Sequence, residues 1–363
     1  MSTHPLIERS QSREVRQAKG FREAAAALAG ETLAAELEQE QASAPNRSAA
    51  GKKHLVSPNS RLAGERKASR DPEHAAIAMV HRQAHAERGL LLPDDIGNFD
   101  PIHAGVVLKS GPADKAQGAS DPNFGIDKID IAGIGPEDRL ALGVMKFIAP
   151  SANRVGTGDT PLRALLEGLA HTGVVLANRE AVVGELAEKS GRTFSDAPPI
   201  LMIIGSQRYW ELCRKREAQR GAAWIRELER LALEIEEATG ITILFLALRV
   251  NSDPGWNYDG GSPAFDGEVR LLPAWEHGAG RIKPKAKPRS RKGSATLADE
   301  IVEADLDRPV RSYAVSDHYT AGDRIEHPTL GLGVVQGIAG TGKIRVHFDE
   351  RKSVLVHDRA PSA

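Results

Sequence analysis

The stretch IDKIDIAGIGPEDRLALGVMKFI, residues 126–148, decides the fold of the central part of the chain. Its beginning, IDKIDIAGI (126–134), alternates in the way expected of a strand with one covered face. The pair Gly135-Pro136 then marks a turn, because glycine and proline interrupt regular structure. RLALGVMKFI (139–148) is a second apolar segment of strand length. We therefore predict a β-hairpin here.

Two continuous apolar runs follow further along the chain, PPILMIIG (198–205) and ITILFLALRV (241–250). Continuous apolar runs of this length are typical of strands that are covered on both faces. The segment between them, AAWIRELERLALEIEEATG (222–240), has apolar residues at helical spacing. A strand–helix–strand unit of this kind predicts parallel pairing with a right-handed crossover. The fold class expected is thus α/β, a mixed sheet with flanking helices.

Further helices are indicated at 71–88 and 156–191. Thr160 is a good N-cap for the second segment, and Pro161 suits the first helical position. Gly191 is a plausible C-terminal stop. An apolar stripe follows the cap at helical spacing, formed by Leu162, Leu165, Leu166 and Leu169.

The sequence divides into four parts. Residues 1–71 are polar and rich in Ser, Ala and Arg, and predict a largely disordered arm with one helix at 21–41, or alternatively a docking helix for a partner. The α/β domain is expected at 72–280, followed by a charged linker at 281–312. The last part, 313–359, is expected to form a small all-β barrel.

The predicted linker begins with the basic run RIKPKAKPRSRKGS and continues with the acidic run TLADEIVEADLDRPV. Opposite charge blocks of this kind usually form a solvated tether. Alternatively, the basic run binds DNA phosphates in a salt-dependent way that does not depend on base sequence. The candidate binding residues are Lys283, Lys285, Lys287, Arg289, Arg291 and Lys292.

Composition limits the classes of function. The 363 residues carry a net charge of −1, so any nucleic-acid contact must come from local patches. Cys213 is the one cysteine, which excludes an internal disulfide and a cysteine-based zinc site. Neither a signal peptide nor an apolar run of membrane-spanning length is evident. We therefore expect a cytoplasmic protein without a membrane partner.

The C-terminal segment, residues 319–359, reads as short strands separated by glycine corners. Arg324-Ile325-Glu326-His327 alternates as a strand, and GVVQGI, KIRVHFD and SVLVHD follow as three more. Within it, GDRIEHPTLGLGVV resembles the signature of the Tudor-like (SH3-like) domain at the C-terminus of UvrD-like repair helicases, and it is similar to the N-terminal module of CarD-type transcription regulators. Leu330 stands where that pattern usually has an aromatic residue. The resemblance implies docking on RNA polymerase or another protein.

The same segment contains GIAGTGK, Gly337–Lys343, which has the glycine and lysine spacing of a phosphate-binding loop. Such a loop requires Ser or Thr after the lysine, and a helix whose N-terminal amides point at the phosphate. Ile344 follows instead and begins a strand-like run. We therefore predict a hairpin turn and not a nucleotide site.

The order of elements from 72 to 250 is similar to the PD-(D/E)XK nuclease fold, also called restriction-endonuclease-like. That resemblance implies two acidic groups and a lysine at one point of the sheet. In such a site the carboxylates hold Mg²⁺, which polarises the phosphate and helps to make hydroxide. The lysine stabilises developing charge or orients water.

Matched to this pattern, Asp130 is the candidate first acid and metal ligand, and Lys146 is the candidate lysine. The second acid of the pattern falls at Val144, which departs from it. Glu167 in the following helix is the candidate replacement, with Asp159 in the loop before it as an alternative. Asp127 is a substitute for Asp130. Each residue also has an ordinary structural interpretation, as a strand-end hydrogen-bond acceptor, a lysine reaching to water or an exposed helix residue.

Three other patterns are weaker. Asp253, Asp259, Asp266 and Glu268 form an acidic loop that suits a metal or a lid, or simply a surface connection. His81 and His85 have i, i+4 spacing but no surrounding metalloprotease motif. Cys213 lies beside basic residues that favour a thiolate, but no partner base is evident.

The sequence therefore supports three functional hypotheses, and it leaves open whether the α/β domain is an enzyme. The first is a nucleic-acid-associated adaptor with a nuclease-like domain and a protein-docking barrel, acting in transcription or DNA repair. The second is an active Mg²⁺-dependent DNA nuclease in repair or defence. The third is a structural protein that assembles with itself, and the sequence leaves the oligomeric state open.

Overall fold

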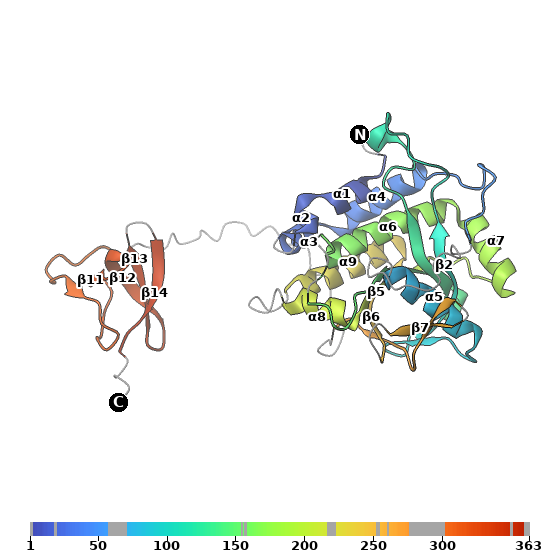
Figure 1. Ribbon diagram of the computed structural model, residues 1–363. Coiled ribbons are helices and arrows are strands. Elements are labelled where there is room, and N and C mark those ends of the chain that lie inside the picture. The colour runs from blue at the N-terminus through green and yellow to red at the C-terminus, as the bar shows by residue number, and fades with distance from the viewer. Residues whose placement is uncertain are drawn as a thin grey trace. The chain divides into compact units, whose positions relative to one another are not determined.

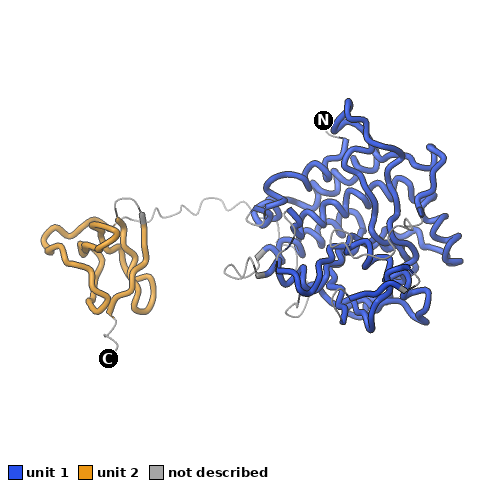
Figure 2. Tube along the Cα trace, in the orientation of Figure 1, with its two compact units in different colours: residues 1–285 blue, residues 286–363 orange. Residues whose placement is uncertain are grey.

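A computed structural model describes residues 3–17, 20–56, 71–153, 155, 158–215, 223–251, 255–259, 261–275, 302–348 and 351–358. The chain divides into two compact units, Met1–Lys285 (unit 1) and Ala286–Ala363 (unit 2), which are coloured separately in Figure 2. Each unit is described by itself. In the described part of the chain, no helix has both the length and the apolar character that crossing a bilayer requires.

Unit 1 is built on a seven-stranded mixed sheet with the order β1-β2-β3-β4-β5-β6-β9 (Figure 1). Strands β1 to β4 are antiparallel neighbours, β4, β5 and β6 run parallel, and β9 is antiparallel to β6. Edge strands β1 and β9 contact each other, so the sheet curls nearly into a barrel. The strands are β1 Leu90–Leu92, β2 Gly97–Val107, β3 Lys128–Ile134, β4 Leu140–Lys146, β5 Ile200–Ser206, β6 Thr242–Arg249 and β9 Arg270–Pro273.

The predicted hairpin is confirmed as β3 and β4, which pair from Ile134↔Leu140 to Ile131↔Gly143. Their connection is a short 3-10 turn, Pro136–Asp138. The two apolar runs form β5 and β6, and every residue of β5 is buried. The two strands pair in parallel, as predicted. Their apolar runs are continuous because parallel strands are usually covered on both faces.

Helices and a small hairpin cover the two faces of the curled sheet. Helix α5 and the β7–β8 hairpin pack over one face, around Met79, Phe99 and Trp256. Helices α6 and α9 pack on the other face, with residues of α1, α3, α4 and α7 in the same core. The bounds are α1 Pro5–Gln11, α2 Arg13–Arg16, α3 Phe21–Ala27, α4 Gly30–Ala42, α5 Asp71–Ala84, α6 Pro161–Ala177, α7 Arg179–Ser190, α8 Gln207–Lys215, α9 Ala223–Thr239, β7 Trp256–Asp259, β8 Ser262–Phe265, and a 3-10 turn Gly118–Ser120.

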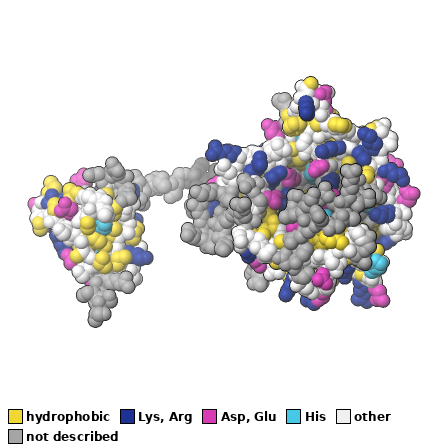
Figure 3. Space-filling model, in the orientation of Figure 1, with side chains coloured by type: hydrophobic (Ala, Val, Ile, Leu, Met, Phe, Trp, Pro, Cys, Tyr) yellow, Lys and Arg dark blue, Asp and Glu magenta, His cyan; other side chains and the backbone are white. Residues whose placement is uncertain are grey.

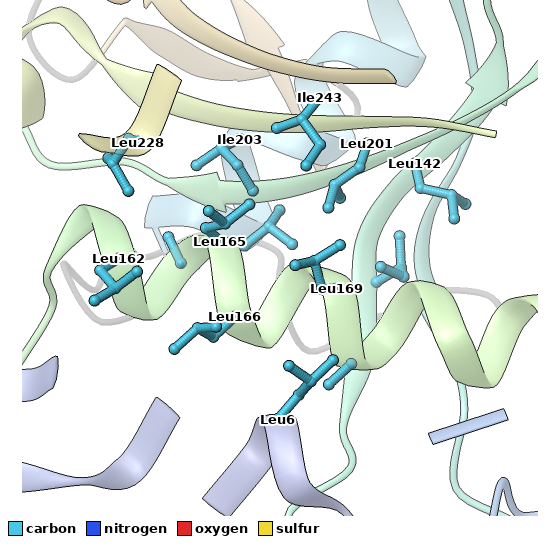
Figure 4. Close-up of a cluster of buried hydrophobic side chains, with 14 of the residues drawn as sticks. Leu6, Leu142, Leu162, Leu165, Leu166, Leu169, Leu201, Ile203, Leu228 and Ile243 are labelled. Atoms are coloured by element: carbon cyan, nitrogen blue, oxygen red, sulfur yellow. The ribbon is translucent and has the colours of Figure 1, made fainter. Parts of the chain in front are cut away.

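Helix α6 is the central helix of unit 1, and it begins as its sequence predicts. The Thr160 hydroxyl accepts the Arg163 N–H, and Pro161 is the first helical residue. In Figure 4, Leu165 and Leu169 lie on the side of the sheet residues Ile203 and Leu201, while Leu166 lies on the opposite side. Helix α6 is therefore enclosed between the sheet and the N-terminal helices, which explains why nearly all of its residues are buried.

The structure corrects the expectation of a disordered arm at the N-terminus. Four helices, α1 to α4, fold onto unit 1, and Leu6, Phe21, Leu33 and Leu37 are buried in the core that contains α6. A Cβ atom at Gly173 would lie 2.8 Å from the Glu40 Cβ, so a glycine there permits the close approach of α4. The physical reason is that α6 carries apolar residues on its side toward the sheet and on the opposite side, Leu165 and Leu166 among them, so it needs cover on both.

A buried ionic contact fixes this N-terminal layer. His4 Nδ1 lies 2.5 Å from a Glu40 carboxylate oxygen, and both side chains are almost fully buried. His4 Nε2 lies 2.8 Å from the Pro122 carbonyl oxygen. Burial opposes a charged histidine, but the Glu40 carboxylate outweighs it and raises the pKa of His4. The contact therefore links α1 to α4 and to the loop before β3.

Unit 2 is an all-β unit with the strand order β10-β11-β12-β13-β14. Its core contains Tyr319, Ile325, Val335, Ile344 and Phe348 together with Val346. The four strands predicted from the sequence are confirmed as β11 to β14, and β10 was not predicted. The bounds are β10 Arg311–Ser312, β11 Arg324–His327, β12 Gly331–Gly340, β13 Lys343–Phe348 and β14 Arg351–Val356.

Two details of unit 2 bear on the sequence predictions. The segment GIAGTGK forms the β12–β13 hairpin, with Gly342 at a φ of 66°, so the predicted turn is confirmed. Residues 302–312 belong to this unit and not to a linker, because Val302 exchanges hydrogen bonds with Gln336 and Arg308 pairs with Asp323 at 2.7 Å. The six basic candidates from Lys283 to Lys292 lie outside the described residues.

Candidate functional site

Charged side chains of unit 1 gather where the C-terminal end of β4 meets the start of α6. Lys146 is the last residue of β4, and Glu167 lies in the second turn of α6. Asp159 directly precedes the N-cap of α6, and Asp130 lies on β3. We call these four residues the acid–lysine centre. Strand pairing and the β4–α6 connection thus bring residues from position 130 to position 167 to one place.

Lys146 holds two of the carboxylates. Its Nζ lies 3.0 Å from Asp159 Oδ1 and donates to Glu167 Oε2 at 3.3 Å. The Lys146 side chain is only 14% exposed, so these pairs are weakly screened by water. Burial opposes its charge, but the two carboxylates outweigh burial and raise the pKa of Lys146. The same ammonium, with Arg163, lowers the pKa of Glu167 against the opposing effect of burial.

Asp130 occupies a different environment within the centre. The β3–β4 backbone pairing ends at Ile131↔Gly143, and Asp130 Oδ2 accepts the Met145 N–H at 2.7 Å. Burial raises the pKa of Asp130 to about 6, although this hydrogen bond and the charge of Lys146 oppose the rise. Asp130 is thus the acid of the centre whose charge is least well compensated.

Two residues that sequence reasoning did not select complete the surroundings of the centre. Arg163 Nε donates to Glu167 Oε1 at 2.8 Å, and its Nη1 donates to the Gly158 carbonyl at 3.3 Å. His171 is 92% buried and its Nε2 has no hydrogen-bond partner. Burial lowers the pKa of His171. Arg163, Glu167 and His171 recur every four residues in an otherwise apolar helix, and that spacing was the available signal.

The N-terminal layer also reaches the centre. The Thr160 hydroxyl, next to Asp159, donates to the Val15 carbonyl oxygen at 2.6 Å. The Arg16 side chain lies against Gly158, where a Cβ atom would come within 2.8 Å of its Nε. Helix α2 therefore supports the loop that presents Asp159 to Lys146.

The arrangement does not fit a Mg²⁺ ion as it stands. Magnesium prefers oxygen ligands at about 2.0–2.1 Å in octahedral geometry. The three carboxylates of the centre supply the right atoms, but the Lys146 ammonium is bonded to two of them. Among the described residues, no group of three or more His, Cys, Asp or Glu side chains is placed to hold one metal ion. No metal-dependent step is therefore derived for this centre.

The structure brings together Asp130, Lys146 and Glu167, which the sequence singled out, and also Asp159, which the sequence offered as the alternative to Glu167. Asp127 is not part of the centre, because its side chain is 72% exposed and lies 3.6 Å from the Lys109 ammonium. Val144 is buried in the core that contains α6, so the position expected to carry the second acid is apolar.

The weaker candidates have ordinary environments. His81 in the last turn of α5 and His85 directly after the helix lie side by side, with ring centroids 4.8 Å apart. Cys213 is buried in the core, an environment in which thiols are usually inert. The acidic loop forms the β7–β8 hairpin packed on α5, and Glu268 pairs with Arg270 at 2.8 Å. Asp253 lies outside the described residues.

Unit 2 presents a different kind of surface. Register places Arg345 opposite Val354, and Lys343 opposite Val356, on β13 and β14. The cationic side chains of this outer face, Lys343, Arg345 and Lys352, are exposed and have no carboxylate partner within the described residues. Val354 is 57% exposed among them. We call these four residues the β13–β14 face.

Exposed apolar side chains are concentrated in unit 2. Nine large hydrophobic residues are exposed in the described chain, and six of them lie in this smaller unit. Figure 3 shows hydrophobic side chains gathered on the visible face of unit 2. The six residues are Leu306, Val310, Val315, Leu332, Ile338 and Val354.

Comparison with protein-family models, with curated proteins and with solved structures gave no match to this chain. The features of the chain that bear on its function are therefore the geometry of the acid–lysine centre and of the β13–β14 face.

Proposed function

We propose that the chain is a nucleic-acid-associated adaptor, with unit 1 as a non-catalytic, nuclease-like body and unit 2 as a protein-docking module. The observation that carries this proposal is that the two units differ in whether their lysine and arginine side chains are paired with carboxylates. Lys146 in the centre is bound by the protein's own carboxylates, while the cations of the β13–β14 face have no carboxylate partner in the part of the chain that the structure describes. Paired charges hold a structure together, and unpaired exposed charges remain available to a partner.

The restriction-endonuclease-like classification of unit 1 is part of this proposal. It is supported by the succession of α5, the antiparallel strands β2 to β4, α6 and β5. It is also supported by the position of Asp130 on β3 and Lys146 on β4, which matches the places that the resemblance implies. The apolar Val144 and the lysine-bound acids support loss of metal-dependent catalysis in such a body.

The docking role of unit 2 is supported by its exposed surface. Interface centres are commonly apolar with a charged rim, and Val354 surrounded by Lys343, Arg345 and Lys352 has that form. A partner suited to this face carries acidic residues around an apolar centre, because opposite charges steer association. RNA polymerase or a component of the repair machinery is the partner class that the SH3-like resemblance implies.

The nucleic-acid role rests on the run from Lys283 to Lys292, which lies outside the described residues. Its six positive charges are complementary to the negative phosphates of DNA. The affinity that such contacts supply falls steeply as the salt concentration rises. Anisotropy of labelled single-stranded and duplex DNA tests it, with the full chain at two salt concentrations. We expect salt-sensitive binding that is at least tenfold weaker when the six residues are replaced by Gln. Equal affinity for the two proteins would contradict the proposal.

The docking role is tested separately by measuring binding of the full chain to purified RNA polymerase from the source organism. We expect binding that is lost in Arg345→Glu and kept in Lys115→Glu, which reverses an exposed charge in unit 1. No binding, or equal loss in both variants, would count against docking through this face. Light scattering of the same samples tests self-assembly, which remains the third prediction.

A Mg²⁺-dependent nuclease is kept as a second candidate, because Asp130, Lys146, Asp159 and Glu167 do converge. Cleavage of plasmid and single-stranded DNA with Mg²⁺ or Mn²⁺ tests it. Cleavage by the wild-type chain that disappears in both Asp130→Ala and Lys146→Ala would replace the non-catalytic proposal. We expect no cleavage by any of the three proteins.

A further inference from the structure

We propose that Lys189 is a modification site, at which the lysine amine takes an acyl group from an activated donor, an acyl phosphate or an acyl thioester, with His103 as its base. This site lies outside the proposed function, because neither the basic run from Lys283 to Lys292 nor the β13–β14 face includes these two residues. It is formed where helix α7 contacts strand β2 (Figure 1).

The hydrogen bonds of His103 fix which ring nitrogen faces the lysine as a base. Lys189 lies in the last turn of α7, and its Nζ is 2.8 Å from Nδ1 of His103 on β2. His103 Nε2 lies 3.2 Å from the Val56 carbonyl oxygen. Because a carbonyl oxygen only accepts hydrogen bonds, Nε2 of the neutral ring carries the proton and Nδ1 keeps its lone pair. The basic nitrogen of the imidazole is therefore held at the lysine amine.

The electrostatic surroundings disfavour a positive charge on either partner. His103 is 4% exposed, and burial together with the charge of Lys189 lowers the pKa of His103 to about 4, so this ring is neutral at pH 7. Burial also lowers the pKa of Lys189. Glu185, one turn earlier on α7, acts against the shift of His103. Its carboxylate oxygens, however, accept the N–H groups of His54 and Leu55 at 2.9 and 2.8 Å.

Other lysines of unit 1 differ from Lys189 in their partners. Lys109, Lys128 and Lys146 are each paired with a carboxylate, which favours the protonated form. Lys189 forms no ion pair with any residue that the structure describes, and its partner is a neutral imidazole. Its side chain is also exposed, so a small donor can reach Nζ. The free amine is the nucleophilic form of lysine, and a lowered pKa increases its fraction at neutral pH.

The pair has the composition of an activated nucleophile, in which a base lies within hydrogen-bond reach and a third group orients the base. Here the three groups are Lys189, His103 and the Val56 carbonyl. The neutral amine attacks the acyl carbonyl carbon, an N–C bond forms, and the bond from that carbon to oxygen or sulfur breaks, releasing phosphate or thiolate with its electron pair. The proton lost by the nitrogen passes to His103 Nδ1 and then to water. The product is an uncharged amide, so the reaction removes one positive charge.

The test measures acetylation of the full chain at pH 7 by acetyl phosphate and, separately, by an acetyl thioester, with the rate at each lysine followed by peptide mass spectrometry. Lys115, an exposed lysine of unit 1, is the control within the same molecule. We expect Lys189 to react at least about tenfold faster than Lys115 with one donor or with both, and the faster donor identifies the source of the acyl group. His103→Gln removes the base, and it should lower the rate at Lys189 by at least about tenfold and leave the rate at Lys115 unchanged.

Two outcomes overturn the inference. One is a Lys189 that reacts no faster than Lys115 with either donor, and the other is a folded His103→Gln in which Lys189 reacts as fast as in wild type. If circular dichroism shows that His103→Gln does not fold, the pH dependence of the wild-type chain decides. The rate at Lys189 should reach half of its maximum at a lower pH than the rate at Lys115, and equal or reversed midpoints would also overturn the inference.

Discussion

The acid–lysine centre of unit 1 and the β13–β14 face of unit 2 use similar residues in opposite ways. In the centre, Lys146 is 14% exposed and bound to two carboxylates. On the face, Arg345 and its neighbours are exposed, lack carboxylate partners among the described residues, and surround the exposed Val354. The comparison teaches that the surroundings of a cation, and not its residue type, decide whether it stabilises the fold or is free for a partner.

The largest expected effect on stability comes from replacing the buried lysine of the acid–lysine centre. Lys146→Met leaves the Asp159 carboxylate of a largely buried cluster without its cation, while Glu167 keeps Arg163, and we expect a loss of about 4 kcal/mol in the free energy of unfolding. Urea denaturation measures it. Lys128→Met is the control, because its pair with Glu73 is about 30% exposed, and it should lose less than about 1 kcal/mol. Equal losses would mean that burial does not distinguish the two lysines.

A second variant tests whether the N-terminal layer belongs to the structure of unit 1. Leu37 on α4 is 3% exposed in the core that contains α6, so Leu37→Ala should lower stability by about 3 kcal/mol. Glu38→Ala on the exposed side of α4 should change it by less than about 0.5 kcal/mol. An unchanged melting temperature in Leu37→Ala would indicate that the N-terminal segment does not pack in this core and is a loose arm.

The third prediction concerns pH and the least compensated acid. The pKa of Asp130 is about 6 in the folded chain, against about 3.9 unfolded, so its ionisation weakens folding as pH rises from about 4 to 6. Asp130→Asn removes this penalty. The stability of the variant relative to wild type should therefore rise by about 2 kcal/mol between pH 4 and pH 7. Asp127→Asn, at an exposed position, should show no comparable trend, and parallel curves for Asp130→Asn and wild type would be the contrary result.

The smallest effect on stability is expected on the exposed side of the comparison. Arg345→Glu should change the free energy of unfolding by less than about 0.5 kcal/mol, since the exposed side chain has no carboxylate partner among the residues that the structure describes. Its effect on partner affinity should be at least tenfold. A large loss of stability would show that the β13–β14 face is structural and not a docking surface.

Several elements could be predicted from local sequence. The β3–β4 hairpin followed from apolar segments around Gly135-Pro136, and the start of α6 followed from Thr160 and Pro161. The parallel strands β5 and β6 followed from their continuous apolar composition. These signals are local, because alternation, capping and turn chemistry act within a few residues.

Other features could not be predicted in the same way. The N-terminal helices contain Ala, Glu and Leu in proportions that also suit a solvated helix, so the disordered-arm prediction was wrong. What decides their packing is α6, whose apolar residues extend beyond its sheet-facing side, and that helix lies far away in the sequence. Arg163 and His171 were missed for the same reason, since their importance depends on the burial of the helix that carries them.

The sequence by itself determined strands β3 to β6 and β11 to β14, the β3–β4 hairpin, the start of α6, and Asp130, Lys146, Glu167 and Asp159 as candidates. Only the tertiary structure decided that Lys146 is bound by both Asp159 and Glu167, where the sequence had offered them as alternatives, and that Val144 is buried in the core. Residue type fixes which charges are available, but their energies depend on distance and on exclusion of water, and both are set by segments far apart in the chain.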